Sequence, residues 1–294
     1  MKVGTLLELG RVSNLPTVWS NVLAGAIVGG GALGIGTFAV LAFVASAFYV
    51  GGMFLNDAFD ADVDARERPE RPIPSGRARR GAVFALGFGA LAVGLGVLVA
   101  YWALGAPPSR GGLVVAGLFV VVAIVVYDRW HKGQPLSPVI MGACRAGLYA
   151  IGALAVAPAL TPRLLVCAAA LLAYVVGLTH AARFENGSAL GRIWPTAFVL
   201  APAAVALVTF VERGAQSPFA IGLLAIALAW AGRALLVALR GGASGIRSAV
   251  GALIAGISLV DATFLAAFGA VTPALFAVAA FALTLLAQRR VLGT

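Results

Sequence analysis

Ten apolar runs, each close to the length of a membrane-spanning helix, divide this chain. A spanning helix needs about 20 mostly apolar residues. With 61% hydrophobic and 11% charged residues, the chain has too little polar surface to cover a water-soluble globule. The sequence therefore predicts an all-α, polytopic transmembrane helical bundle around a central cavity, formed by a single domain over residues 1–294. The expected spans are 15–35, 38–56, 82–104, 112–127, 138–158, 163–181, 194–212, 217–239, 248–270 and 273–288.

The boundary between the last two runs decides whether nine or ten spans are expected. Only Val271, Thr272 and Pro273 separate them. The residue before a proline avoids helical geometry, so this segment predicts a turn. If the two runs fused across it, the count would be nine.

The placement of positive charge predicts the orientation. With ten spans, the loops after the even-numbered spans and the two termini carry sixteen of the 21 Lys and Arg residues, and the opposite loops carry three. By the positive-inside rule, the first set faces the cytoplasm. We expect a multi-pass protein of a bacterial cytoplasmic membrane with its site loops on the cytoplasmic side. The net charge of +10 then reflects topology and attraction to membrane lipid, and needs no nucleic acid partner. The oligomeric state stays open.

More than half of the acidic residues of the chain lie in one stretch. "FLNDAFDADVDARERPERPIPSGRARR", residues 54–80, contains six of the eleven acidic residues and directly follows an apolar run. On a helix, Asp57, Asp60 and Asp64 share one face with Asn56, and Asp62 points elsewhere. The spacing predicts a group of oxygen ligands at the edge of the membrane.

Clustered carboxylates repel one another unless a cation lies among them. Mg²⁺ prefers carboxylate and amide oxygens and accepts substrate phosphate as a further ligand. Arg66, Arg68 and Arg71 follow the cluster, and their planar guanidinium groups suit phosphate oxygens. The alternative is a solvated loop whose mixed charges only keep it soluble, and the spacing argues against it.

These residues resemble a known family. Asn56-Asp57-x-x-Asp60-x-x-x-Asp64, followed by "RPIPSG" at 71–76, is similar to the first aspartate-rich motif of the UbiA superfamily of intramembrane prenyltransferases. "RVSNLPTVWSNVLAG" at 11–25 resembles the first helix of the family, and "YDRWHK" at 127–132 resembles its loop after the fourth span. The resemblance implies that Asn14 and Lys132 bind diphosphate, and that Tyr127 lies near the reacting carbon.

The resemblance also implies a cofactor and a reaction. Mg²⁺ held by the first motif would neutralise charge on a prenyl diphosphate as its allylic carbon–oxygen bond breaks, and an acceptor would capture the cation. Asp57, Asp60, Asp64 and Tyr127 are then the catalytic candidates, and Phe59 and Tyr127 offer aromatic faces to a cation.

The second motif departs from the family pattern. "LTHAARFENGSALGRIWP", 178–195, has His180, Arg183 and Gly187 where aspartates are expected, and Glu185 is its one acidic residue. Three interpretations compete: a one-metal enzyme in which Arg183 binds the diphosphate and Glu185 assists a metal, a changed reaction, or a binding protein without catalysis. Together with "MGACRAGLYAIGAL" and "IRSAVGALIAGISLVDA", this stretch resembles the divergent EboC-like branch of the superfamily.

Three charged residues fall inside predicted spans, where each would cost about 2.5–3.5 kcal/mol. Arg145 is a candidate for substrate binding, with a structural role left open. Asp261 is expected to pair with Arg233 or Arg145. Cys144 and Cys167 lie in apolar runs and are expected to be small buried thiols.

Two functions follow. The first is Mg²⁺-dependent transfer of a prenyl group from an isoprenoid diphosphate to an unidentified acceptor in the membrane. The alternative is a non-catalytic carrier or scramblase for an isoprenoid or another amphipathic metabolite. CDP-alcohol phosphotransferases also have aspartate-rich membrane helices, but the chain lacks their Asp-Gly-x-x-Ala-Arg pattern.

Overall fold

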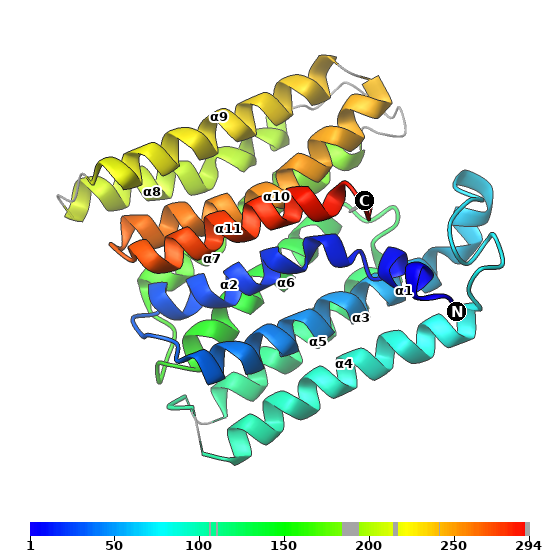
Figure 1. Cartoon of the computed structure of the whole chain (residues 1–294), viewed down its shortest axis with the longest axis horizontal. Helices are drawn as coiled ribbons and strands as arrows, with labels where there is room; N and C mark the ends of the chain where they lie inside the picture. Colours follow the sequence, from blue (N-terminus) through cyan, green and yellow to red (C-terminus); the bar gives the residue numbers. More distant parts are fainter. Residues whose placement is uncertain (106, 110, 184–193, 214–216, 241, 292–294) are drawn as a thin grey trace.

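A computed structural model describes residues 1–105, 107–109, 111–183, 194–213, 217–240 and 242–291, leaving out the side chains of residues 183, 194 and 243. All regular structure in these ranges is helical (Figure 1). The helices are α1 (Val3–Leu9), η1 (Val12–Asn14), α2 (Leu15–Val28), α3 (Ile35–Glu67), α4 (Arg80–Ala103), α5 (Gly112–Trp130), α6 (Ser137–Leu154), α7 (Pro162–Arg183), η3 (Trp194–Leu200), α8 (Ala201–Arg213), α9 (Pro218–Arg240), α10 (Gly242–Ala267) and α11 (Val271–Gln288).

Nine helical segments of the described ranges are long and apolar enough to cross a membrane. The predicted spans thus form as helices, and the all-α bundle is confirmed. The first expected span is the one that falls short. Its helix, α2, has 14 residues and gives way to consecutive glycines, of which Gly30 has a φ of +100°. Glycine adopts this left-handed conformation without a steric penalty, so the helix ends there and not at residue 35.

The last two spans are separate helices, as the turn signal predicts, but the break lies earlier. It falls between α10 and α11, where Gly269 has a φ of +79°. Pro273 lies inside the first turn of α11, where its missing N–H removes no intrahelical hydrogen bond. Glycine, rather than proline, marks the corner.

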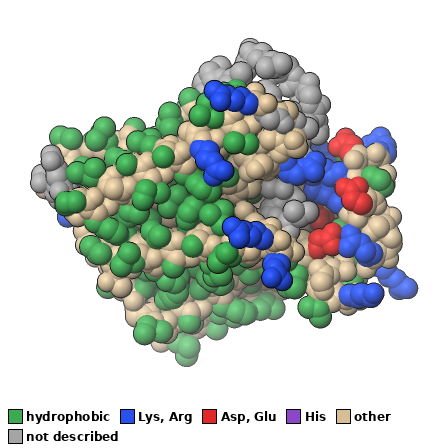
Figure 2. Space-filling view, turned by 45° about the horizontal axis from the view of Figure 1, so that its top comes forward, with side chains coloured by type: hydrophobic (Ala, Val, Ile, Leu, Met, Phe, Trp, Pro, Cys, Tyr) green, Lys and Arg blue, Asp and Glu red, His purple; other side chains and the backbone are tan. Residues whose placement is uncertain are grey.

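The long helix α3 leaves the apolar part of the bundle. It has 33 residues, and its last turns carry the acidic cluster. Figure 2 shows the acidic side chains of this face at one end of the molecule, together with several basic ones; further basic side chains lie nearer the middle, and hydrophobic side chains cover most of the rest. This distribution is the one expected of a membrane bundle whose polar end projects from the lipid.

Helix α10 lies in the middle of the bundle. Within the most apolar stretch of this helix, 83% of the residues are buried, and the helix contacts α2, α7, α9 and α11. Helix α2 packs on α6 so closely that a Cβ atom added to Gly25 would lie 2.2 Å from the Tyr149 carbonyl oxygen. Small residues allow helices to approach in this way where lipid gives little hydrophobic drive. The bundle is therefore tightly filled at its centre.

The buried Asp261 of α10 corrects one expectation. Its carboxylate accepts hydrogen bonds from Asn21 Nδ2, at 3.1 and 2.9 Å, and from the Tyr149 hydroxyl, at 2.6 Å. Arg145 reaches it only through Asn21, and Arg233 lies against Trp230. The predicted arginine partner is wrong because two neutral donors satisfy this carboxylate without a second buried charge.

Candidate functional site

The acidic face of α3 forms as its helical spacing predicts. Asp57, Asp60 and Asp64 are 6%, 9% and 5% exposed, respectively. The side chain of Asp62 is 79% exposed and pairs with Arg80 on the outside of the helix. Three carboxylates therefore converge on the bundle side of α3, and the fourth belongs to its surface.

Two arginines neutralise part of this face. Arg71 Nη1 lies 3.4 Å from Asp57 Oδ1 and 2.9 Å from Asp64 Oδ2, so one nitrogen lies between two carboxylates. Arg11 Nη2 lies 2.9 Å from Asp57 Oδ1. Burial lowers the pKa of Arg11, but Asp57 and the further acids beside it raise the pKa above its usual value, so the guanidinium stays charged.

Arg11 is a site residue that the sequence reasoning missed. It precedes η1 with a φ of +40°, the one positive φ among the described non-glycine residues. A strained backbone of this kind persists only where its surroundings fix it, and here Asp57 and Met53 hold the guanidinium. A basic residue four positions before the first expected span was the available signal.

The loop after α5 brings a lysine and a histidine to this face. Lys132 Nζ lies 3.1 Å from Asp60 Oδ1, and His131 Nε2 lies 3.5 Å from Asp60 Oδ2. The imidazole of His131 also stacks on the Tyr127 ring, with centroids 4.9 Å apart. Lys132 thus lies at the acidic face, and the diphosphate binding expected of it stays a prediction, whereas His131 was not anticipated.

Asp128 is the other residue that was missed. It is 4% exposed, and its Oδ1 accepts a hydrogen bond of 3.4 Å from Asn56 Nδ2. Its Oδ2 is buried and has no hydrogen-bond partner among the residues that the structure describes. An acid in the last turn of an otherwise apolar helix was the sequence signal, since such a residue needs a partner.

Next to these acids lies a narrow cavity of about 80 Å³, lined by Tyr49, Tyr127, Asp128, Cys144 and Arg145 among others. Arg145 Nη1 donates to Thr17 Oγ1 and Asn21 Oδ1, both at 3.0 Å, and its guanidinium lies 5.6 Å from the Tyr49 ring centroid. Arg145 therefore faces the site cavity and ties α6 to α2, and its part in substrate binding stays a prediction. The predicted central cavity is narrow on this side, with a volume of about 80 Å³.

The other predicted binders are placed differently. Asn14 is buried, donating to the Tyr49 hydroxyl at 3.1 Å and accepting from Gln288 at 2.9 Å, so it lies beside the site and not in the acidic face. Arg66 is exposed on the last turn of α3, and Arg68 is half-buried just after it.

Phe59 packs edge-on against Phe84 of α4 and does not line the cavity. Cys144 and Cys167 are free thiols, half-buried and buried.

The second motif lies outside the described residues. Helix α7 includes His180 and ends at Arg183, but the Arg183 side chain, Glu185 and Gly187 are not among the residues that the structure describes. The roles expected for Arg183 and Glu185 stay predictions.

The donor set of the first motif fits a hard divalent cation. One nitrogen of Arg71 already takes a cation position between Asp57 and Asp64. The unpartnered oxygen of Asp128 is a further buried ligand of the type that Mg²⁺ prefers. As they stand, no three His, Cys, Asp or Glu side chains of the described ranges are close enough together to hold a metal ion. A metal between Asp57 and Asp64 would occupy the position that the Arg71 nitrogen takes.

Residues 14–249 match the model of the UbiA prenyltransferase family. The chain belongs to this family. The match includes the acidic face of α3, the loop after α5 and the helices around the cavity. The resemblance seen in the sequence is thereby confirmed, whereas its assignment to the EboC-like branch stays a prediction.

Curated relatives of the chain are archaeal. The digeranylgeranylglyceryl phosphate synthase of Methanopyrus kandleri is 34% identical over 132 residues, 44% of this chain and 45% of the relative. The enzyme of the same name from Natronomonas pharaonis is 31% identical over 136 residues, 46% of each chain. The chain thus spans about half the length of the curated relatives that it matches.

Solved structures share the fold. A UbiA homologue from Aeropyrum pernix K1, without ligand, has a TM-score of 0.66 at 17% identity, covering 87% of this chain and 97% of the other. A homologue from Archaeoglobus fulgidus, bound to GPP and Mg²⁺, has a TM-score of 0.62 at 14% identity, covering 91% and 99%. The chain is an integral membrane protein of this fold, and its expected bacterial origin stays a prediction.

Proposed function

We propose that this chain transfers a prenyl group from an isoprenoid diphosphate to an acceptor within the membrane. The observation that carries the proposal is the convergence of four buried carboxylates with Arg11, Arg71 and Lys132 beside an apolar cavity. Such a site offers ligands for a metal and cations for a diphosphate next to apolar space for a hydrocarbon chain. Family membership and the Mg²⁺-bound homologue support the same reaction.

Each group in the site has a distinct task. Asp57, Asp60, Asp64 and Asp128 would hold Mg²⁺, assisted by Asn56. Bound Mg²⁺ supplies positive charge against the diphosphate that leaves. Arg71 and Lys132, which pair with these carboxylates in the structure, have the geometry and charge to bind phosphate oxygens. The remaining candidates for diphosphate binding are Asn14, Arg66, Arg68, Arg145 and Arg183, with Glu185 as a further metal ligand.

The aromatic wall of the cavity would act on the other end of the donor. Tyr127 lines the cavity beside Asp128, and its ring is held by stacking on His131. An aromatic face attracts a cation that lies within about 6 Å of the ring centroid. We therefore assign Tyr127 to the stabilisation of the allylic cation, before the acceptor captures it.

The relatives suggest which substrates to test first. They are named for making digeranylgeranylglyceryl phosphate, a product with two geranylgeranyl groups on glyceryl phosphate. A panel of isoprenoid diphosphates, including geranylgeranyl diphosphate, should be offered with a geranylgeranylglyceryl phosphate acceptor, and pyrophosphate release measured. We expect release that requires Mg²⁺ and stops with EDTA. Absence of release with every donor would refute the transferase and leave the carrier function.

The orientation is part of the proposal. The loops 68–79 and 131–136 follow the acidic face and its lysine partner, and we place both on the cytoplasmic side. A cysteine introduced at residue 70 should react with an impermeant reagent only from the cytoplasm, and one at residue 160 only from outside. Labelling of both from the same side would contradict this topology.

A further inference from the structure

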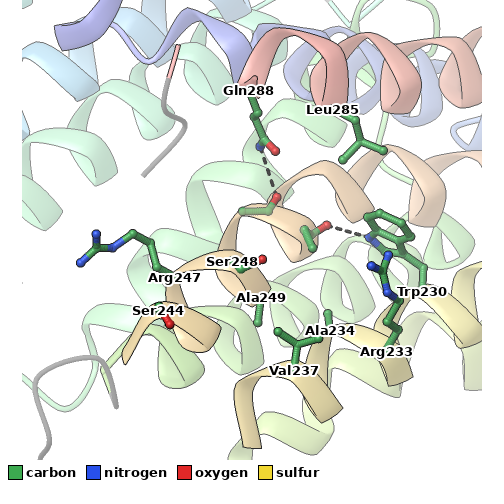
Figure 3. Close-up of a pocket in the computed structure, with 12 residues that line it drawn as sticks. Trp230, Arg233, Ala234, Val237, Ser244, Arg247, Ser248, Ala249, Leu285 and Gln288 are labelled. Carbon is green, nitrogen blue, oxygen red and sulfur yellow. Dashed lines mark hydrogen bonds between the residues drawn. The ribbon is translucent and has the colours of Figure 1, made fainter. Parts of the chain in front are cut away.

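A second cavity of about 470 Å³ lies between α9, α10 and α11 (Figure 3). Its size falls within the range of small-molecule pockets, about 300–1,000 Å³. None of its lining residues lines the cavity beside the aspartates. The described residues around it include Arg233, Arg247 and Ser248 but no acid. The family reaction described above does not account for this cationic cavity.

Arg233 is the residue that most needs explanation. It lies seven residues before the end of the apolar helix α9 at Arg240, which is about 10 Å along the helix axis. Among the described residues, no carboxylate forms an ion pair with it, and its guanidinium lies 5.8 Å from the Trp230 ring centroid. A charge within a span costs about 2.5–3.5 kcal/mol and is by default functional. Its position calls for an anion from outside the chain.

The opposite wall of the cavity adds positive potential. Arg247 and Ser248 lie in the first two turns of α10, are exposed and line the cavity, and the Arg247 side chain extends away from Arg233 (Figure 3). The N-terminal turn of a helix carries partial positive charge and N–H groups that lack intrahelical partners. Two arginines, a hydroxyl group and a helix N-terminus thus border one space.

The apolar side of the cavity is already fixed in shape. The indole N–H of Trp230 donates to the Ala252 carbonyl oxygen at 2.8 Å, and Gln288 Nε2 donates to the Gly251 carbonyl oxygen at 3.2 Å. Val237 and Leu285 complete this side. A ligand that fits therefore carries an anionic head for the arginines and a hydrocarbon chain for the wall.

We propose that this cavity binds a membrane amphiphile through its phosphate headgroup. Arg233 binds the phosphate oxygens, Arg247 and Ser248 add positive potential and a hydrogen-bond donor on the opposite wall, and the hydrocarbon chain lies against Trp230 and Leu285. The site is separate from the aspartates and does not require prenyl transfer.

The position of Trp230 provides a direct test. Phosphatidylglycerol with brominated chains, titrated into the protein in neutral detergent, should quench Trp230 fluorescence in a saturable way. Trp230→Phe supplies the background from the other tryptophans, since the chain has five. Arg233→Gln and Arg247→Gln should each weaken binding at least tenfold, and Arg233→Lys should retain most of it. Arg240→Gln, at the end of the same helix and outside the cavity, is the matched control and should bind as wild type does.

Competition distinguishes the sources of the phosphate. Displacement of the brominated lipid by glycerol 3-phosphate or inorganic phosphate would support the site and show that the phosphate alone is recognised. Binding of the lipid without such displacement would support it and identify a lipid ligand. Equal quenching by brominated diacylglycerol, which has no phosphate, would overturn the proposal. So would unchanged lipid affinity in Arg233→Gln and Arg247→Gln that elute as folded protein.

Discussion

The ammonium group of Lys132 lies 3.1 Å from Oδ1 of Asp60, so the loop after α5 reaches the acidic face of α3. Two motifs far apart in the sequence thereby form one site. Asp60 already contacts the lysine, and we propose that it also binds the metal, so it is the residue to change first.

Asp60→Asn should lower the affinity for an isoprenoid diphosphate in the presence of Mg²⁺ by more than tenfold, about 1.4 kcal/mol. The amide keeps the size of the side chain but removes a metal ligand and the partner of Lys132 and His131. Calorimetric titration with a non-reactive thiodiphosphate analogue measures the loss.

Asp62→Asn is the matched control for Asp60→Asn. Asp62 is on the same helix, but its side chain is 79% exposed and pairs with Arg80. We expect less than a twofold change in affinity. Equal losses in the two variants would show that the cluster acts only as bulk negative charge, and would favour the solvated-loop interpretation.

Asp128→Asn tests the acid that the sequence reasoning missed. Its Oδ2 is buried, without a hydrogen-bond partner in the described part of the chain, so this atom is the one most ready to accept a metal ion. We expect Mn²⁺ affinity, measured by electron paramagnetic resonance, to fall about tenfold, since an exchange of carboxylate for amide removes a full charge. Glu67→Gln, on the exposed last turn of α3, should leave it unchanged. Wild-type Mn²⁺ affinity in Asp128→Asn would exclude Asp128 from the metal site.

Periodicity predicts much of this molecule from sequence. The apolar runs locate the helices, and the i, i+3, i+7 spacing separates Asp57, Asp60 and Asp64 from Asp62. Both patterns are local, because they depend on helix geometry alone. Lys132 was identified as a site residue from the likeness of "YDRWHK" to the family loop, and it lies at the acidic face.

Contacts between distant segments are what the sequence does not reveal. Arg11 and Asp57 meet because η1 turns the chain back over α3, with a left-handed residue that no residue preference predicts. The wrong partner predicted for Asp261 has the same origin. Charge alone suggested an arginine, whereas the packing of α2, α6 and α10 places two neutral donors around the carboxylate.

Asp261→Ala should destabilise the bundle. The change leaves the Asn21 amide and the Tyr149 hydroxyl group without their acceptor, at about 1–3 kcal/mol for an unsatisfied buried group. The midpoint temperature of thermal unfolding in detergent should fall. Asp62→Ala, which changes an exposed side chain, is the control and should leave that temperature unchanged. An unchanged midpoint in Asp261→Ala would mean that water replaces the carboxylate without loss.

Gly25→Ala should disturb the crossing of α2 and α6. The added Cβ atom would lie 2.2 Å from the Tyr149 carbonyl oxygen, so the two helices must separate. Overpacking of this kind costs about 1–3 kcal/mol, and the thermal midpoint should fall. Because α2 also carries Thr17 and Asn21, which hold Arg145 at the site cavity, KM for the donor should rise as well.

Gly89→Ala is the control for this crossing. Gly89 is exposed on α4, and a Cβ atom added there meets nothing within 4 Å. Alanine favours a helix over glycine by about 1 kcal/mol, so this variant should be as stable as wild type or more so. If Gly25→Ala matched Gly89→Ala in midpoint and in KM, the close approach of α2 to α6 would have no part in holding Arg145. The position of that arginine would then depend on its own hydrogen bonds alone.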